Sequence, residues 1–189
     1  MAKAFHFDMT SCIGCKTCQV ACKDKNDLPI GTLFRTVESY EVGEFPAVDA
    51  FHVSLTCNHC ENPACVAACA SGAMYKSEEG VVLHDDALCM GCGACVEACP
   101  YGVPKMLETG KAGKCDSCYA IRQDGFEPQC VSACPMRALD FGELEDLLAK
   151  YPDAVPLGIM PFMPESETVP TTLVTPKAIV NEEFEKIVY

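Results

Sequence analysis

The residues of this chain that can do chemistry are its 16 cysteines, which fall in four groups along the sequence. The first and third groups are Cys12, Cys15, Cys18, Cys22 and Cys89, Cys92, Cys95, Cys99. Both follow the spacing C-x2-C-x2-C-x3-C, in which three thiolates hold one cubane iron–sulfur cluster and the fourth reaches a second cluster. The second and fourth groups vary this spacing and are Cys57, Cys60, Cys65, Cys69 and Cys115, Cys118, Cys130, Cys134. With four thiolates per cubane, the sequence predicts four 4Fe-4S clusters and an electron-transfer protein.

A disulfide scaffold and a set of zinc sites are the other common uses of dense cysteine. A disulfide scaffold requires export, and residues 1–10 contain no basic segment followed by an apolar run. Repeated C-x2-C pairs are also poorly placed to bridge distant segments. A tetrahedral zinc site takes four ligands from two pairs and has no use for a third cysteine two residues further on. The spacing therefore favours cubanes, and a zinc-bound interaction scaffold remains a remote alternative.

Length and charge limit the partners of the chain. Its 189 residues are enough for one or two small domains. The formal net charge is -13, and four oxidised cubanes on 16 thiolates lower it to about -21. This charge disfavours nucleic acid and suits either a solvated exterior or a docking surface for a basic partner. The sequence has no run of roughly 18–20 apolar residues, so contact with a membrane would require another subunit.

The residues other than cysteine do not predict a catalytic site. The sequence shows no Ser/His/Asp arrangement and no glycine-rich phosphate loop, and every thiol is already assigned to iron. His59 lies between two cysteines, where we expect a hydrogen bond near sulfur or a packed turn rather than ligation. Lys16, Lys23 and Arg137 lie beside cysteines, where a positive charge either raises a reduction potential or is simply solvated. We therefore expect a subunit that is not an enzyme by itself.

Short elements are expected around the cysteine groups. The sequence predicts strands over residues 3–7, 51–55 and 81–84, and helices over residues 17–23, 64–70, 94–98 and 142–150. A β-hairpin is expected over residues 73–84, and residues 31–53 predict a second hairpin or an extended excursion. Residues 151–189 contain six prolines and are interpreted as an extended tail that wraps a neighbour or the chain itself, with a disordered tail as the alternative. A tail without an evident intramolecular role argues against a free carrier.

The four groups must pair into two-cluster units. The second and third groups are joined by a short hairpin, so they are expected to form one unit over residues 51–104. The first and fourth groups then form the other unit around it, from residues 1–50 and 105–145, with residues 146–189 as a tail that contacts a partner subunit. The expected fold class is α+β, with two bacterial-ferredoxin-like units, the second inserted in the first. Spacing alone also permits pairing first with second and third with fourth.

The inserted arrangement, with the last cysteine of each run exchanged, predicts four ligand sets. Set 1 is Cys12, Cys15, Cys18 and Cys134. Set 2 is Cys22, Cys115, Cys118 and Cys130. Set 3 is Cys57, Cys60, Cys65 and Cys99. Set 4 is Cys69, Cys89, Cys92 and Cys95.

Six motifs carry a resemblance to a known family. They are C-x-G-C-K-T-C-x-x-A-C-K-D from Cys12, C-N-H-C-E-x-P-A-C from Cys57, S-G-A-M from Ser71, C-x-G-C-x-x-C-x-x-A-C-P-Y-G from Cys89, K-C-D-x-C-Y from Lys114 and C-P-x-R-A-L-D-F-G from Cys134. In this order they resemble the four-cluster ferredoxin-type iron–sulfur (beta) subunits of molybdopterin oxidoreductases, and most of all those of dimethyl sulfoxide reductases. The resemblance implies the interleaved pairing and a relay of electrons to or from a large molybdenum or tungsten catalytic subunit.

The same resemblance implies an order and a set of partners. Set 1 is expected nearest the catalytic subunit, and set 4 nearest a quinol-oxidising membrane anchor where one exists. The protein is expected in the cytoplasm, or exported folded with a partner that bears a twin-arginine signal. The other electron-transfer interpretations are a relay in a hydrogenase or formate dehydrogenase assembly and a free polyferredoxin.

Overall fold

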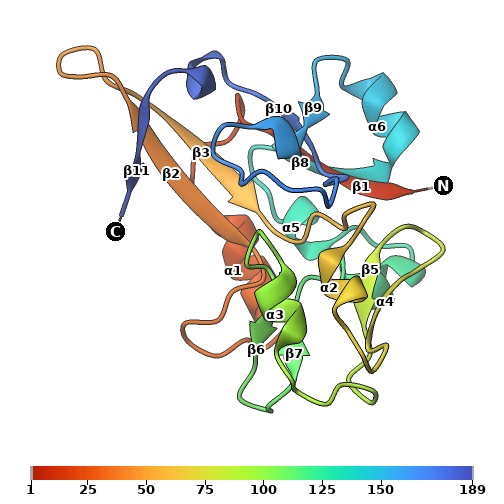
Figure 1. Ribbon diagram of the computed structural model, residues 1–189. Helices are drawn as coiled ribbons and strands as arrows, with labels where there is room; N and C mark the ends of the chain where they lie inside the picture. The colour runs from red at the N-terminus through yellow and green to blue at the C-terminus, as the bar shows by residue number, and fades with distance from the viewer. Residues whose placement is uncertain (1, 189) are drawn as a thin grey trace.

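Strand β1 (Lys3–Asp8) leads into the first cysteine group and lies inside a four-stranded sheet of the computed structural model, which describes residues 2–188 (Figure 1). Residues 4–7 are all buried, so both faces of β1 are covered, because successive side chains of a strand point to opposite faces. β1 pairs antiparallel with one neighbour and parallel with the other. Across the sheet the strands are β8 (Leu139–Glu143), β1, β10 (Leu173–Thr175) and β9 (Val155–Pro156).

A second sheet projects from the body of the molecule and has the order β11-β2-β3 (Figure 1). Its strands are β2 (Thr36–Val42), β3 (Asp49–Leu55) and β11 (Phe184–Ile187). The rings of Tyr40 and Phe51 stack across the β2–β3 pair with centroids 4.9 Å apart, and the two residues lie opposite each other in the register. Such aromatic cross-strand pairs stabilise the register of a hairpin.

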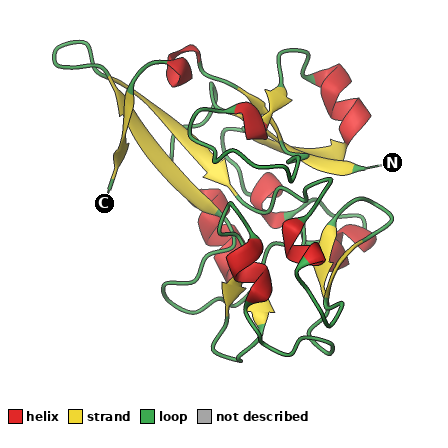
Figure 2. Cartoon of the chain, viewed as in Figure 1, coloured by secondary structure: helices red, strands yellow, loops and turns green. Residues whose placement is uncertain are grey.

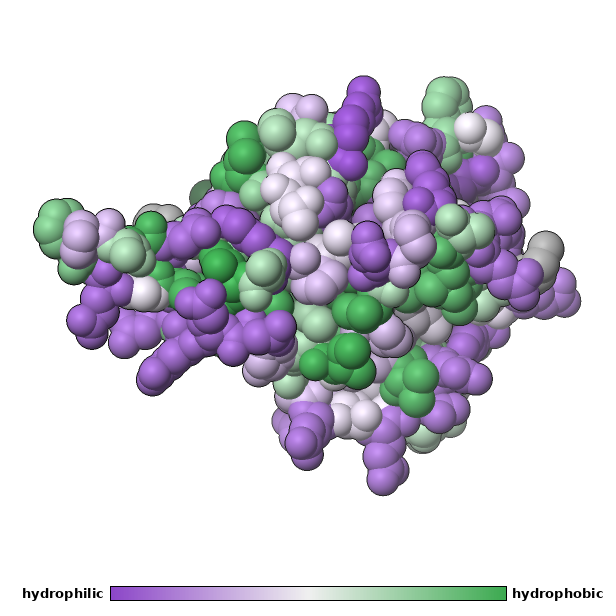
Figure 3. Space-filling view, turned by 90° about the horizontal axis from the view of Figure 1, so that it is seen from above, coloured by the Kyte–Doolittle hydropathy of each residue, from purple (hydrophilic) through white to green (hydrophobic). Residues whose placement is uncertain are grey.

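This β2–β3 pair confirms the hairpin expected over residues 31–53. Gly43 takes a left-handed φ of 83° in the connection between the strands. The connection also exposes two apolar side chains, Phe45 at 92% and Val48 at 47%. Viewed from above, the sides of the projection are mainly hydrophilic, whereas its far end is mainly apolar (Figure 3).

The half of the molecule opposite the four-stranded sheet consists of short helices and two small hairpins (Figure 2). The helices that follow cysteines are α1 (Thr17–Lys25), α2 (Ala64–Ala67), α3 (Ala94–Ala98), α4 (Tyr119–Gln123) and α5 (Gln129–Ser132). The hairpins are β4 (Met74–Lys76) with β5 (Val82–His84) and β6 (Lys105–Met106) with β7 (Ala112–Gly113). Helix α1 packs against α5, and α2 packs against α3. The first cysteine group therefore lies beside the fourth, and the second beside the third.

The segment after helix α6 (Leu144–Lys150) binds the chain's own body. β10 pairs with β1, β11 pairs with β2, and two 3₁₀ turns, η1 (Leu157–Ile159) and η2 (Ala178–Asn181), lie between the strands. Val174 and Val180 are 0% exposed. The disordered-tail alternative is wrong for this segment. The assumption that the segment lacks an intramolecular role is also wrong, because these strands complete both larger sheets.

We predict that Val174→Ala in β10 lowers the free energy of unfolding by about 2 kcal/mol, because it removes two buried methyl groups and leaves a cavity. Val188→Ala is the control in the same segment, since Val188 is 88% exposed, and we expect its effect to stay below about 0.5 kcal/mol. Denaturant unfolding of the anaerobically prepared protein measures both. Equal effects of the two substitutions would contradict a buried tail.

Candidate iron–sulfur sites

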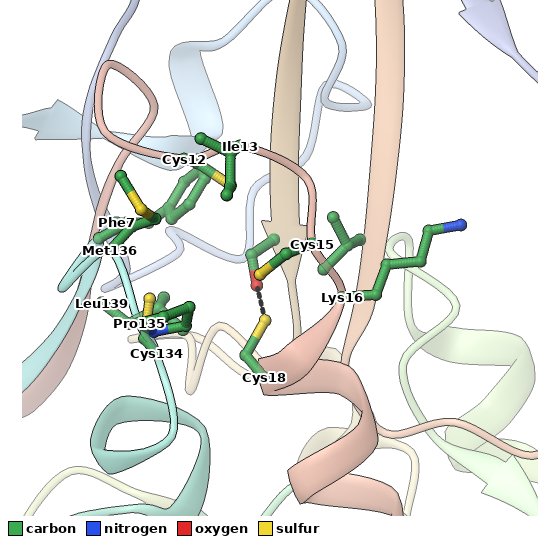
Figure 4. A pocket seen from close by; sticks show the side chains of 13 residues that line it. Phe7, Cys12, Ile13, Cys15, Lys16, Cys18, Cys134, Pro135, Met136 and Leu139 are labelled. Carbon is green, nitrogen blue, oxygen red and sulfur yellow. Dashed lines mark hydrogen bonds between the residues drawn. The ribbon is translucent and has the colours of Figure 1, made fainter.

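The four cysteines of set 1 line one cavity (Figure 4). Cys12 and Cys15 lie in the loop after β1, Cys18 lies in the first turn of α1, and Cys134 follows α5. Residues 134 and 12 are thus brought to one cavity by the β1–β8 pairing and by the contact of α1 with α5. Apolar side chains complete the wall and include Phe7, Val37 and Leu139.

The cysteines of sets 3 and 4 line two further cavities. One is lined by Cys57, Cys60, Cys65 and Cys99. The other is lined by Cys69, Cys89, Cys92 and Cys95. Each cavity combines three cysteines of one group with the last cysteine of another. The contact between α2 and α3 produces this arrangement, because each helix lies next to the cysteines of its own group.

The cysteines of set 2 are buried together between these cavities. Cys22, Cys115, Cys118 and Cys130 are between 4% and 7% exposed. Burial raises the pKa of Cys22 to about 12, and the neighbouring thiolates of Cys115, Cys130 and Cys118 contribute in the same direction. The thiols of set 2 therefore lie close enough to interact through charge.

The spacing of these sulfurs suits a polynuclear cluster better than a single ion. Across residues 2–188, no three side chains of His, Cys, Asp or Glu gather closely enough to hold one metal ion. Structural zinc requires four ligands at about 2.0–2.3 Å from one centre. Cysteines around a cavity leave room for the iron and sulfide of a cubane, so the residues present fit a 4Fe-4S cluster.

Burial and hydrogen bonding act in opposite directions on the cysteine thiols. Burial raises the pKa of Cys57 to about 12 and that of Cys118 to about 11, so iron must displace a proton from these thiols. At the more open set 4, the Met74 N–H donates to Cys69 Sγ over 3.3 Å and lowers the pKa of that thiol. Such N–H···S bonds stabilise thiolate charge and are a common feature around iron–sulfur clusters.

Two glycines fix the shape of the cysteine loops. Gly14 has a φ of 68°, and a Cβ at this residue would lie 2.6 Å from the ring of His52. Gly91, at the same place in the third group, has a φ of 72°, and its Cβ would lie 2.1 Å from the carbonyl oxygen of Gly110. A side chain is excluded at both positions by backbone conformation and by space.

The sequence predicted only some of the roles that polar residues near the cysteines have in the structure. His59 is 1% exposed, its Nδ1 accepts a hydrogen bond from the Val82 N–H, and burial keeps its pKa well below the ordinary value. His59 is therefore a packed, neutral side chain. Lys23 donates to the carbonyl oxygens of Leu28 and Pro29 and so holds a loop, whereas Arg137 is exposed.

Sequence reasoning missed two buried cations. Arg35 is 2% exposed and Lys114 is 6% exposed, and both lie among the cysteines. Lys114 could have been noticed because it directly precedes Cys115 in a motif. Arg35 carries no local signal, because the nearest cysteine in sequence is Cys22 and the contact depends on the fold.

Two known protein families match parts of this chain. The chain matches the 4Fe-4S dicluster domain over residues 48–144 and the 4Fe-4S binding domain over residues 9–25. These matches, with cysteines gathered around cavities, define an iron–sulfur protein of the ferredoxin type. Among residues 2–188, none of the helices combines the length and the apolar content that a membrane-spanning helix requires.

Individual relatives show which kind of iron–sulfur protein the chain is similar to. The protein is 42% identical to the B chain of anaerobic dimethyl sulfoxide reductase from Escherichia coli K12, covering 92% of its own length and 88% of the relative. It is 43% identical to the thiosulfate reductase electron transfer subunit PhsB of Salmonella typhi, over 74% of each protein. It is 35% identical to the B subunit of tetrathionate reductase from Salmonella typhimurium, over 88% of its own length and 69% of the relative. The protein belongs to the family of dimethyl sulfoxide reductase-type iron–sulfur subunits, and it is an electron-transfer subunit and not the catalytic one.

We predict that removal of iron abolishes cooperative unfolding of this chain. Six cysteines form part of the largest hydrophobic core, and without metal their facing thiols leave cavities there. Differential scanning calorimetry of the anaerobic protein before and after treatment with a chelator and oxidant measures the effect. The untreated protein, handled identically without chelator, is the control. A sharp transition in the iron-free chain would show that the fold does not depend on its clusters.

Proposed function

We propose that this chain holds four 4Fe-4S clusters in sets 1 to 4 and relays single electrons to or from a molybdopterin catalytic subunit. The observation that carries the proposal is the convergence of the cysteines of sets 1, 3 and 4 on three separate cavities, with set 2 buried between them. A bound cubane supplies a one-electron redox couple. The chain's own residues hold it, exclude water and set the charge around it.

Electrostatic influence and packing between the sets support the order 1-2-3-4. The pKa of Cys130 in set 2 is raised by burial and by neighbours that include Cys18 of set 1. The pKa of Cys57 in set 3 is raised by burial and by Cys115 of set 2. Cys65 of set 3 and Cys95 of set 4 belong to one small hydrophobic core. Each set therefore lies beside the next, as a row of electron carriers requires.

We infer two ferredoxin-like units from the same packing. The first consists of residues 1–50 and 105–145, the second is inserted as residues 51–104, and residues 146–189 are the tail that we propose contacts a partner subunit. The boundary at residue 50 needs adjustment, because it cuts β3, which pairs along its whole length with β2. A boundary after Leu55 keeps that hairpin in the first unit.

Exposed apolar side chains at both ends of the row support two docking faces. Ile13 and Met136 line the cavity of set 1 and are 58% and 42% exposed. Met90 lines the cavity of set 4 and is 69% exposed. By the family resemblance, the catalytic subunit, with its molybdenum or tungsten, docks at set 1, and a membrane anchor docks at set 4.

We predict that Ile13→Glu with Met136→Glu separates this chain from its catalytic subunit, because charge is placed in an apolar contact. Met90→Glu, at the opposite end, is the control and leaves that contact intact. The measurement is anaerobic purification of the tagged complex from its own host, with molybdenum, tungsten and pterin determined in the large subunit that comes with it. Purification of the wild-type chain alone, with full iron content and no pterin-containing subunit, would favour a free polyferredoxin.

A second prediction tests the exchange of cysteines between runs. Cys130→Ser and Cys134→Ser alter neighbouring residues of one group, and we expect them to damage different clusters, with each variant losing at most about four irons. The EPR spectrum of Cys134→Ser should match that of Cys15→Ser, which alters set 1. The spectrum of Cys130→Ser should match that of Cys118→Ser, which alters set 2.

Iron and sulfide analysis accompanies each spectrum of this series. A Cys134→Ser spectrum that matches Cys118→Ser would contradict the exchange and favour a run that holds its own cluster. About sixteen irons in the wild-type chain are required for four cubanes, and far fewer would overturn the proposed function.

A further inference from the structure

Arg35 is a fully buried cation without a carboxylate partner. It lies just before β2 and is 2% exposed, and no ion pair among residues 2–188 includes it. Its Nη1 donates to Ser54 Oγ over 2.9 Å, and its guanidinium lies over the ring of Phe5 with Cζ 5.0 Å from the centroid. Nε and Nη2 are buried and have no hydrogen-bond partner within residues 2–188. A buried charge with open donors is costly unless something negative lies beside it.

The groups that surround Arg35 are cysteines of two different sets. Burial by itself would lower the pKa of Arg35, but the thiolates of Cys130, Cys18, Cys115 and Cys22 raise it above the ordinary value. Cys18 belongs to set 1 and the other three belong to set 2. Arg35 is therefore placed at the junction of the two sets.

A hydroxyl connects the guanidinium to set 1. Ser54 Oγ accepts from Arg35 Nη1 over 2.9 Å and lies 3.5 Å from Cys18 Sγ (Figure 4 shows the second contact). On the side of set 2, burial raises the pKa of Cys130, and the charge of Arg35 acts against that rise. One buried side chain thus acts on a ligand of each set, through a hydroxyl on one side and through its charge on the other.

We propose that Arg35 is a positioning residue that raises the reduction potentials of the clusters of sets 1 and 2 together, with its remaining N–H groups directed at cluster sulfur. The proposal rests on the cluster assignment proposed above. One-electron reduction adds a negative charge to a cluster, and a cation that keeps its proton stabilises the reduced state of both neighbours. Donation to sulfur acts in the same direction.

Lys114 offers a comparison within the same chain. Its Nζ donates to the carbonyl oxygens of Val82 and Cys115, and the residue lines the cavity of set 3. Its charge lies beside Cys57 and Cys65, for which burial raises the pKa and Lys114 lowers it. A neutral residue at Lys114 should therefore affect set 3 and leave set 1 unchanged.

The test is an EPR-monitored redox titration of the anaerobic holoprotein. The signals of sets 1 and 2 are assigned by the cysteine variants described above, and those of sets 3 and 4 by Cys65→Ser and Cys92→Ser. Arg35→Met should lower the potentials of the clusters of sets 1 and 2 by at least a tenfold change in each reduction equilibrium, which is 59 mV for one electron. The clusters of sets 3 and 4 should not move. Arg35→Lys keeps the charge but loses donors, so its potentials should lie between those of wild type and Arg35→Met. Lys114→Met should instead lower the potential of the cluster of set 3.

The outcomes separate this inference from the proposed function. Full iron content in Arg35→Met with unchanged potentials would overturn the role of Arg35 while leaving the four-cluster relay intact. An equal shift of all four clusters would also overturn it, since a general loosening of the fold would then be the cause. If Arg35→Met loses iron, the same titration is carried out on Arg35→Gln and Arg35→Lys. Arg35→Gln retains an N–H donor for Ser54. Unmoved potentials in both would reject the proposal.

Discussion

The structure depends on sulfur buried next to sulfur. Six cysteines lie in the largest hydrophobic core, where other small proteins place leucine or phenylalanine, and burial raises the pKa of Cys22 and Cys57 to about 12. Facing thiols around cavities are a poor core by themselves, because cavities cost stability. The core becomes complete only when the cavities hold something that binds all of their sulfurs. Helices of four or five residues, too short to be stable alone, are consistent with a fold organised by such ligation.

The buried sulfur atoms also explain where two positive charges of the chain lie. The chain has a formal net charge of -13, and cluster ligation makes it more negative, yet two of its 14 Lys and Arg residues are withdrawn from the surface. Arg35 and Lys114 lie among cysteines of sets 1, 2 and 3, and no ion pair within residues 2–188 joins either of them to a carboxylate. Burying these cations is explained if the clusters supply the missing negative charge. The acidic surface remains free for partners.

The sequence predicted the local features of the sites well and the long-range features poorly. Cysteine spacing indicated the chemistry, and local patterns predicted the hairpins β2–β3 and β4–β5. The parallel pairing of β10 with β1 was missed, because a three-residue strand among prolines has no periodicity to detect. Arg35 was missed for a similar reason, since its cysteine neighbours are assembled only by the fold.

The exposure of the cysteines argues for conduction along the row of sets. Cys15 in set 1 and Cys92 in set 4 are exposed, whereas all four cysteines of set 2 are buried. Under the proposed assignment, the inner clusters exchange electrons only with their neighbours, and solvent or a partner meets the row at its ends. The pairing of β10 with β1 and of β11 with β2 removes one argument against a free carrier, because the segment after α6 has an intramolecular role. The apolar residues at the two ends, Ile13 and Met90, give the stronger reason for a subunit, since a free carrier has no need to expose them beside both terminal sites.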